Sequence, residues 1–119
     1  MQKKKVYIAD DDPDILEIIS MILEDNGFEV ETSPDGRSLQ HIKNKPDVIL
    51  LDIRMSGTHG GEICRDLKGS SEMRKIPVIL VSANKDIKEI ASNCGADDIL
   101  PKPFEIVDLI NMAKRYSNS

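Results

Sequence analysis

The stretch Val48-Ile49-Leu50-Leu51-Asp52 is a run of four aliphatic side chains that ends in a carboxylate. The turn-forming segments 45–47 (KPD) and 56–57 (SG) bound the run. A short, continuous apolar run between two turns is typical of a strand that is buried on both faces, as in a parallel sheet. Its last residue is then at the carboxyl end of the strand, where open α/β sheets place their ligands.

Segments of strand type and of helix type alternate along the whole chain. Such alternation with short connections predicts a parallel sheet that is covered by helices on both faces. The predicted fold class is α/β, with a doubly wound, flavodoxin-like (βα)5 sheet of strand order 2-1-3-4-5. Strands are expected at residues 6–9, 28–32, 48–51, 77–81 and 98–100, and helices at 13–26, 38–44, 61–67, 85–93 and 104–116.

Length and composition limit what the chain can do. The 119 residues suit a single domain, 1–119, and the net charge of −5 argues against direct binding of nucleic acid. The sequence has no signal peptide and no apolar run long enough for membrane insertion. Cys64 and Cys94 lack CxxC spacing and suit a reducing compartment, so we expect a cytoplasmic protein.

Local signals indicate where the first and last helices begin and what they bury. Asp12 suits an N-cap, Pro13 suits the first helical position, and Gly27 suits a left-handed C-terminal cap. In the last helix the residues with helical spacing that should form the buried stripe are Ile106, Leu109, Ile110 and Ala113.

Charged or polar residues follow four of the five predicted strands. Asp10 and Asp11 follow the first strand, Asp52 the third, Ser82 the fourth and Lys102 the fifth. The order 2-1-3-4-5 places the first and third strands side by side at the switch point, where a crevice opens. Three carboxylates in one crevice repel each other unless a cation is present, and Mg²⁺ prefers such oxygen ligands. The sequence therefore predicts a magnesium site.

Each of these motifs has a simpler interpretation when it is taken alone. The acidic triplet 10–12 is also typical of a helix N-terminus, where carboxylates complement the dipole. Lys102 alone would be read as a solvated loop lysine, although the flanking Pro101 and Pro103 keep it out of a helix. The arrival of all these groups at one sheet edge is what favours a site.

As an ordered set, these residues resemble a response regulator receiver domain of bacterial two-component signalling, over essentially the whole chain. The motifs that carry the resemblance are Asp10-Asp11, Asp52, Ser82-Ala83 and Lys102-Pro103-Phe104. The resemblance implies that Asp52 is the phosphoacceptor for a histidine kinase or phosphotransfer protein. It also implies that the chain is no enzyme beyond catalysing its own phosphorylation and dephosphorylation.

The resemblance also implies roles for the other groups of the site. Lys102 and the Ser82 hydroxyl would contact the phosphoryl oxygens, and the Lys102–Pro103 bond would be cis. A downstream output protein or domain would bind the face formed by strands 77–81 and 98–100 and helices 85–93 and 104–116. The implied Mg²⁺ ligands are Asp11, Asp52, the backbone carbonyl of Arg54 and, through a water molecule, Asp10.

The chain departs from the family pattern at three places. Ile99 stands where an aromatic switch residue is usual, which puts that mode of switching in doubt. Ser56 follows Met55 where a proline is usual, so we expect a more mobile loop after the acceptor. Arg54 and Asn84 occupy the two positions that tune the lifetime of the phosphoryl group in this family.

The predicted first helix has more apolar surface than one buried face requires. Its apolar residues spread over roughly 200° of a helical wheel, against a stripe of ~100° for a buried face. Those suited to the core are Leu16, Ile19 and Leu23, and those expected to be partly exposed are Ile15, Ile18 and Met21. We infer that the exposed edge docks the kinase or a phosphotransfer helix. The alternative is that the helix is more deeply buried.

Other classes of function are alternatives to a phosphoacceptor. A phosphatase of the haloacid-dehalogenase type needs a second acid two residues after its nucleophile, where this chain has Arg54. Neither GxxxxGK[ST] nor GxGxxG occurs, which disfavours nucleotide binding. A receiver-like interaction module that takes no phosphate is the main alternative. The last residue is Ser119, so we expect no output domain in this chain, which suits either a stand-alone receiver or a piece of a longer regulator.

Overall fold

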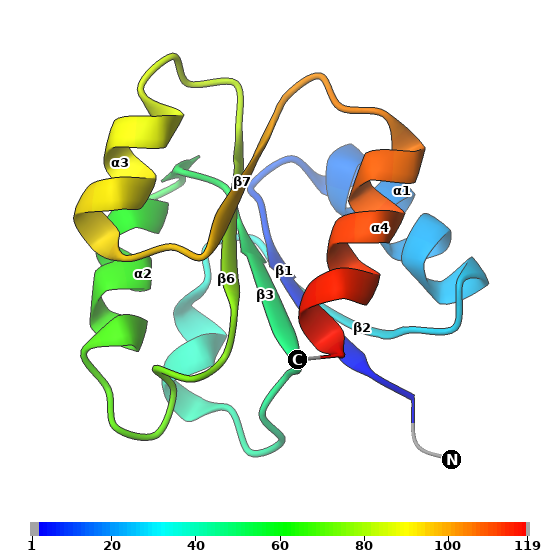
Figure 1. Ribbon diagram of the computed structural model, residues 1–119, viewed down its shortest axis with the longest axis horizontal. Helices are drawn as coiled ribbons and strands as arrows, with labels where there is room; N and C mark the ends of the chain where they lie inside the picture. Colours follow the sequence, from blue (N-terminus) through cyan, green and yellow to red (C-terminus); the bar gives the residue numbers. More distant parts are fainter. Residues whose placement is uncertain (1–2, 119) are drawn as a thin grey trace.

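Five parallel strands form the centre of the structure, a computed structural model that describes residues 3–118 (Figure 1). The strands are β1 (Lys5–Ala9), β2 (Glu29–Ser33), β3 (Val48–Leu51), β6 (Val78–Ser82) and β7 (Asp98–Pro101). Their order in the sheet is β2-β1-β3-β6-β7, which confirms the predicted order 2-1-3-4-5. A separate antiparallel pair, β4 (Arg54–Met55) and β5 (Thr58–His59), directly follows Asp52.

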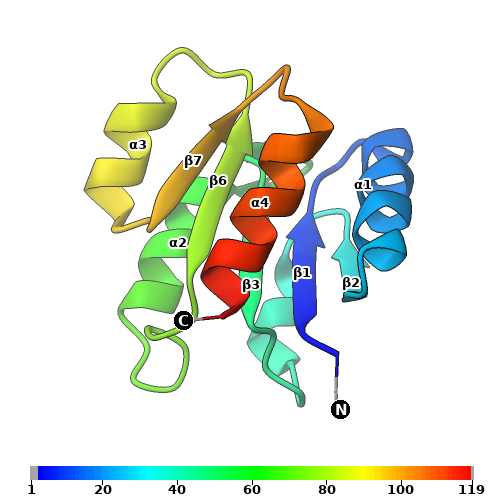
Figure 2. The ribbon, with the colours of Figure 1, turned by 45° about the vertical axis from the view of Figure 1, so that its right-hand side comes forward.

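Helices cover both faces of this sheet. On one face lie α1 (Pro13–Asp25) and α4 (Ile106–Ser117). On the other face lie the 3₁₀ helix η1 (Arg37–His41), α2 (Gly60–Lys68) and α3 (Ile87–Cys94), and Figure 2 shows the two layers from a second side. The arrangement is the doubly wound architecture that the alternation of segments predicts.

The core has two halves, one on each face of the sheet, because side chains alternate along a strand. Val6 and Ile8 of β1 pack in the half under α1 and α4, whereas Tyr7 and Ala9 pack in the half under η1, α2 and α3. All four residues of β3 are buried, as expected for the central strand of a parallel sheet.

The first helix has the predicted ends. The Asp12 carboxylate accepts hydrogen bonds from the backbone N–H groups of Asp14 and Ile15, and Pro13 occupies the first turn. Gly27 follows the helix with a φ of 89°, a left-handed conformation that favours glycine. Within residues 3–118, no helix is sufficiently long and apolar to traverse a lipid bilayer.

The helix predicted at 38–44 is shorter than expected and is not an α-helix, because this segment forms the five-residue 3₁₀ helix η1. Its two apolar residues, Leu39 and Ile42, are three positions apart, which is the repeat of a 3₁₀ helix as well as one step of an α-helix. Gly36 in left-handed conformation precedes it, and Ile42 leaves it in extended conformation. The sheet is therefore covered by four α-helices and one 3₁₀ helix among the described residues.

The last helix begins two residues later than predicted, and its expected buried stripe needs one correction. Leu109 and Ala113 are buried and Ile110 is half-buried, but Ile106 is 57% exposed. Glu105 is the N-cap, so Ile106 is the first residue of the helix. The buried side chains of the helix begin one turn later, at Leu109.

Candidate functional site

Three carboxylates meet at the carboxyl ends of β1 and β3. One oxygen atom from each of Asp10, Asp11 and Asp52 lies within 4.8 Å of the others. The neighbouring strands cause this meeting, since Ala9 pairs with Leu51 and the Asp52 N–H donates to the Ala9 carbonyl at 2.9 Å. Asp10 is buried, Asp52 is half-buried and Asp11 is exposed. The structure thus brings together all three predicted carboxylates.

Lys102 reaches this cluster from the end of β7. Its Nζ lies 2.9 Å from Asp10 Oδ2 and 3.4 Å from Asp52 Oδ2. Its backbone N–H donates to the Ser82 carbonyl at 2.9 Å, which fixes the start of the loop beside the end of β6. The Lys102–Pro103 bond is cis, as expected. The ammonium group is therefore held between two of the three carboxylates.

Burial and charge shift the ionisation of the two groups that face each other across the cleft. Burial raises the pKa of Asp52 above its ordinary value, and the charge of Asp10 adds to this increase, while Lys102 opposes it. For Lys102, burial alone would lower the pKa. The hydrogen bond to Asp10 and the negative charges of Asp52 and Asp10 outweigh burial, so that the pKa is raised.

Ser82 completes the predicted set at the end of β6. Its side chain is buried, and its Oγ accepts a hydrogen bond from the backbone N–H of Asn84 at 3.1 Å. A cleft of about 460 Å³ opens here, and its lining includes Asp52, Arg54, Ser82, Asn84 and Lys102. The cleft is large enough for a phosphoryl group and places the hydroxyl and the ammonium on the same opening as the acceptor.

The chemistry of the cluster fits Mg²⁺. Its donors are carboxylate oxygens, the hard ligands that this ion prefers over nitrogen or sulfur. Lys102 offsets only one of the three negative charges, so a divalent cation would balance the remainder. The residues present are therefore suited to hold the metal that the sequence predicts.

The segment after Asp52, which the sequence predicts to be a loop, forms the short hairpin of β4 and β5. Ser56 and Gly57 turn the chain between β4 and β5, with a φ of 77° at Gly57. The Gly60 N–H donates to the Ile53 carbonyl at 2.6 Å and closes the hairpin. A Cβ on Gly60 would overlap the backbone carbonyl oxygen of Asp52, so only glycine allows the chain to pass so close behind the acceptor.

The buried side chain of Met55 and several side-chain hydrogen bonds join this hairpin to its surroundings. Thr58 Oγ1 donates to the Asp35 carbonyl at 2.8 Å, and Ser56 Oγ lies 3.5 Å from an Asp11 carboxylate oxygen. Thr58 is a residue that the sequence reasoning did not select, because no motif links it to Asp35 23 residues earlier. The His59 ring Nδ1 accepts a hydrogen bond from the Gly61 N–H and caps α2.

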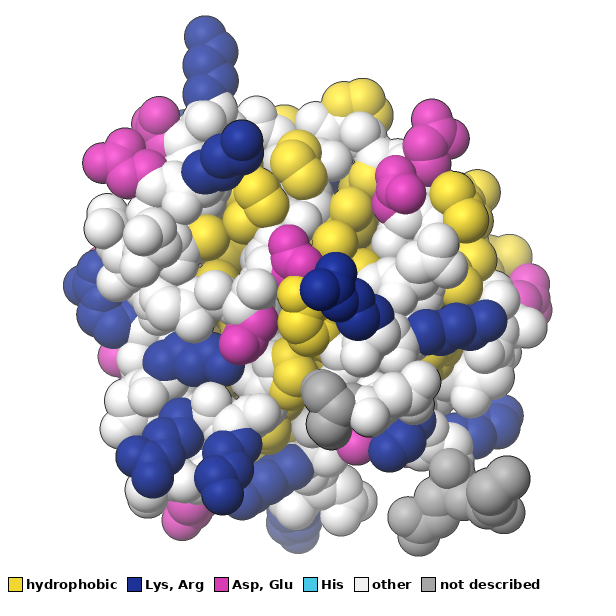
Figure 3. Space-filling model, viewed as in Figure 1, with side chains coloured by type: hydrophobic (Ala, Val, Ile, Leu, Met, Phe, Trp, Pro, Cys, Tyr) yellow, Lys and Arg dark blue, Asp and Glu magenta, His cyan; other side chains and the backbone are white. Residues whose placement is uncertain are grey.

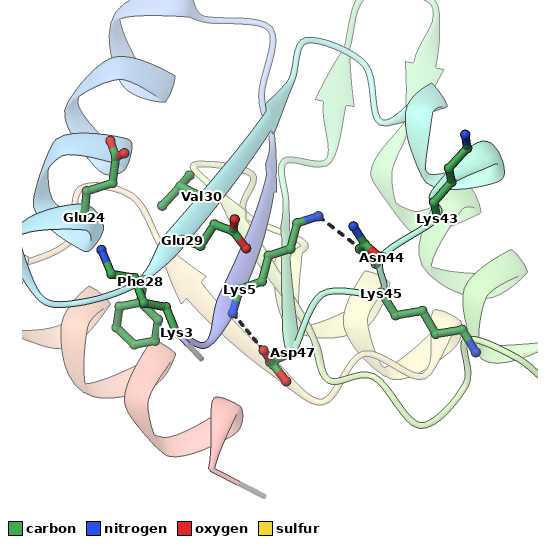
Figure 4. Close-up of a pocket in the computed structure, with 10 residues that line it drawn as sticks. All are labelled: Lys3, Lys5, Glu24, Phe28, Glu29, Val30, Lys43, Asn44, Lys45 and Asp47. Carbon is green, nitrogen blue, oxygen red and sulfur yellow. Dashed lines mark hydrogen bonds between the residues drawn. The ribbon is translucent and has the colours of Figure 1, made fainter. Parts of the chain in front are cut away.

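A second cavity, of about 950 Å³, lies at the amino ends of β1, β2 and β3, and lysine and acidic side chains line it together (Figure 4). The backbone N–H of Lys5 donates to Asp47, and its Nζ donates to the Asn44 carbonyl and pairs with Glu31 at 2.8 Å. These internal pairings satisfy the central lysine. The cavity is also remote from the carboxyl ends of the strands, so the candidate site is the cluster around Asp52.

Comparisons with known proteins agree with this geometry. The family model of the response regulator receiver domain matches residues 6–114. Response regulator MprA of Mycolicibacterium vanbaalenii is 32% identical over 110 residues, which cover 89% of this chain and 47% of that protein. The chain thus spans about half the length of the curated relatives that it matches.

Solved structures show the same similarity. A putative response regulator from Chloroflexus aurantiacus superposes with a TM-score of 0.91 at 29% identity, covering 99% of this chain and 100% of that one. The receiver domain of a sensor histidine kinase from Pseudomonas aeruginosa, solved with a magnesium ion coordinated in its active-site cleft, gives 0.89 at 25% identity, covering 99% and 100%. Together with the family match, these likenesses establish that the chain belongs to the response regulator receiver domains of two-component signalling.

Proposed function

We propose that Asp52 accepts a phosphoryl group from the phosphohistidine of a histidine kinase or phosphotransfer protein, in a reaction that requires Mg²⁺. The observation that carries this proposal is the position of Lys102, whose Nζ contacts both Asp10 and Asp52 from a different strand. A lysine that converges with three carboxylates on one cleft suits phosphoryl transfer, in which positioning and charge neutralisation supply most of the catalysis.

The transfer is a single displacement at phosphorus. A carboxylate oxygen of Asp52 forms the new O–P bond while the bond from phosphorus to the donor breaks, and the donor leaves with the electron pair of that bond. Lys102 exchanges its contact with Asp52 for the phosphoryl oxygens. The Ser82 hydroxyl, which already accepts from the Asn84 N–H, keeps its own proton free to donate to a phosphoryl oxygen.

The metal would be held by oxygen atoms of four residues that meet at this edge of the sheet. Bound Mg²⁺ would neutralise the charge that develops on the phosphoryl oxygens. The proposed direct ligands are the carboxylates of Asp11 and Asp52 and the backbone carbonyl of Arg54, with Asp10 acting through a water molecule. The magnesium ion coordinated in the active-site cleft of the Pseudomonas receiver domain supports the choice of metal.

The same cleft would also be the place where water hydrolyses the acyl phosphate and returns Asp52 to its unphosphorylated state. The cleft is open, and both Arg54 and Asn84 lie on its lining, where they can affect the approach of water to the phosphorus atom. We propose that the chain catalyses this dephosphorylation on itself, and that its catalytic action is limited to its own acceptor.

The kinase or phosphotransfer protein would dock on α1. Ile18 and Met21 are 55% and 58% exposed, and Ile15 is half-buried against the core. Exposed apolar side chains on the helix that follows Asp10 and Asp11 suit a partner that must reach the acceptor. Charged residues at these positions would therefore weaken docking.

The downstream output protein or domain would bind the face made by β6, α3, β7 and α4. Figure 3 shows hydrophobic side chains that reach the surface between α3 and α4. Ile99, at the usual position of an aromatic switch residue, is half-buried on β7 within this face. We propose a protein surface as the target here, since the net charge of −5 disfavours nucleic acid.

Intact mass after incubation with acetyl phosphate and Mg²⁺ tests this function. A single phosphate adduct that needs Mg²⁺ and is absent from Asp52→Asn is the expected result. A folded protein that binds Mg²⁺ but gains no phosphate from acetyl phosphate or from a kinase would contradict it and favour a phosphate-independent interaction module.

A further inference from the structure

We propose that Thr58 is a positioning residue for the metal site, because its hydroxyl fixes the hairpin that presents the backbone carbonyl of Arg54. The inference rests on the proposed function in one respect, namely that this carbonyl is a metal ligand. It goes further by assigning a role to a side chain that lies outside the cluster of carboxylates and the cleft.

The hairpin is too short to hold itself in place. Its ladder consists of two residue pairs, Arg54 with His59 and Met55 with Thr58. An isolated two-stranded ladder is at best marginally stable in water, and this one is shorter than most. The position of Arg54 therefore depends on contacts between the hairpin and the rest of the molecule.

The contact made by Thr58 is the shortest side-chain hydrogen bond that the hairpin turn and β5 make with neighbouring segments, ahead of the 3.1 Å bond between the Gly61 N–H and His59 Nδ1. Thr58 Oγ1 donates to the Asp35 carbonyl at 2.8 Å, whereas Ser56 Oγ is 3.5 Å from Asp11. Thr58 is half-buried and is the cross-strand partner of Met55, which adjoins Arg54. Its hydroxyl thus holds the residue that lies opposite Met55, the residue that follows Arg54 in the chain.

The acceptor of this hydrogen bond is itself held rigidly. Asp35 belongs to a turn in which Ser33 Oγ accepts from the Gly36 N–H at 2.9 Å and the Asp35 carboxylate accepts from the Arg37 N–H at 3.0 Å. Gly36 has a φ of 75°, and a Cβ there would approach Ile63 Cδ1 to 2.8 Å. The turn is therefore a fixed support for Thr58.

The same turn also anchors a carboxylate of the cluster. The backbone N–H of Asp10 donates to the Ser33 carbonyl at 3.0 Å, so Asp10 and Thr58 are attached to residues two positions apart. The turn consequently sets the relative position of the Asp10 carboxylate and the Arg54 carbonyl. Loss of the Thr58 hydroxyl would release one of these two attachments and leave the Asp35 carbonyl without this partner.

The substitution Thr58→Val tests the inference, because valine has nearly the same shape and lacks the donor. Thr58→Ser keeps the donor and should restore the site, and Thr58→Ala is a second variant without a donor. Thr32→Val is the matched control, since Thr32 lies exposed on the edge strand β2. Calorimetric titration with Mg²⁺ alone gives the affinity, and amide hydrogen exchange without metal reports on residues 54–60.

We expect Thr58→Val and Thr58→Ala to bind Mg²⁺ about tenfold more weakly, as is usual when a group that orients a metal ligand is lost. Their amides at 54–60 should exchange faster without metal, while Thr58→Ser and Thr32→Val match the original protein. A purely structural role would lower the thermal midpoint but leave the Mg²⁺ affinity of the folded protein unchanged.

Unchanged Mg²⁺ affinity in folded Thr58→Val, or unchanged hydrogen exchange in its hairpin, would overturn the inference. The proposed function fails separately, when the original protein binds Mg²⁺ and takes no phosphate. In that case the affinities of the Thr58 variants still decide whether this side chain positions the metal site.

Discussion

Lys102 acts as an internal counterion for the acidic cluster. Its Nζ lies between Asp10 and Asp52, and its side chain is only 20% exposed. Without a metal, this one cation lowers the repulsion among three carboxylates that share a small volume. The removal of Lys102 and the removal of one carboxylate should therefore have opposite effects on stability.

We predict that Lys102→Met lowers the free energy of unfolding in a chelator by roughly 1–2 kcal/mol, less than for a fully buried pair because the site is partly open to solvent. Asp11→Asn should instead raise it, since Asp11 is exposed and adds charge to the cluster. Urea denaturation in EDTA measures both effects. A loss of stability in both variants would contradict the account of the cluster as mutually repelling.

The two tyrosines should both ionise above their ordinary pKa. Burial raises the pKa of Tyr7, against the hydrogen bonds with Ser33 and Ser38. The hydrogen bond to Asp98 raises the pKa of Tyr116, and burial adds to it. Since the chain has two tyrosines and no tryptophan, the absorbance of tyrosinate reports on both, and Tyr116→Phe isolates Tyr7.

Because the pKa values of both tyrosines are raised by folding, the folded protein should lose stability at high pH. Above the ordinary pKa the folded protein retains phenolic protons that the unfolded chain loses, so the free energy of unfolding falls as the pH rises through that range. An alkaline titration in which either tyrosine ionises at its ordinary value of 10.0 in the folded protein would refute this.

Sequence reasoning finds residues of the site that directly follow predicted strands. Asp10, Asp52 and Lys102 are of this kind, because the end of a strand fixes where the next residue emerges. Thr58 is different, since its link to Asp35 depends on how a hairpin lies against a turn 23 residues earlier. No periodicity or motif in the chain encodes that distance.

Among the elements, η1 is the one that differs most from its prediction. It presents a single buried side chain, Leu39, to the core, whereas Ile42 just beyond it is half-buried. We expect Leu39→Ala to lower the free energy of unfolding by about 2–3 kcal/mol and Ile42→Ala to lower it by clearly less. Urea denaturation of the two variants gives the comparison. Equal losses would mean that the segment does not pack as described.

The exposed edge of α1 leads to a prediction about partners. Ile18→Glu should slow phosphoryl transfer from a cognate kinase while the rate with acetyl phosphate stays the same, because only the protein donor needs the apolar surface. The effect on the free energy of unfolding should be within about 0.5 kcal/mol, as for other surface substitutions. Thr32→Glu, also exposed but on β2, is the matched control. Equal slowing with both donors would reject docking on α1.

Apolar patterns predict a strand well when both of its faces are buried, as in β3. They also predict a helix well when apolar residues recur with helical spacing, as in α1. They fail where one or two side chains decide between structures, as at Leu39 in η1 and in the segment that forms β4 and β5. Ile106 shows a third limit of apolar patterns. Helical spacing identifies the residues on one face of α4, but it does not show which turn of the helix first contacts the core.

For the whole molecule, the order of strands is the property that makes the site. The groups that meet there come from the ends of β1, β3, β6 and β7, and the contact between Asp10 and Lys102 joins residues 92 positions apart. The alternation of strands and helices predicts a parallel, doubly wound sheet, and the order 2-1-3-4-5 expected for a flavodoxin-like sheet brings the groups together. We therefore propose for the entire fold that these strand ends form a phosphoacceptor site centred on Asp52.

Reductive trapping tests that claim most directly. Borohydride reduces the acyl phosphate of an aspartate to homoserine, so peptide mapping after phosphorylation identifies the acceptor. We predict homoserine at position 52, dependent on both the phosphoryl donor and Mg²⁺. Homoserine at another position, or none in a folded protein that binds Mg²⁺ and has met an active donor, would contradict it.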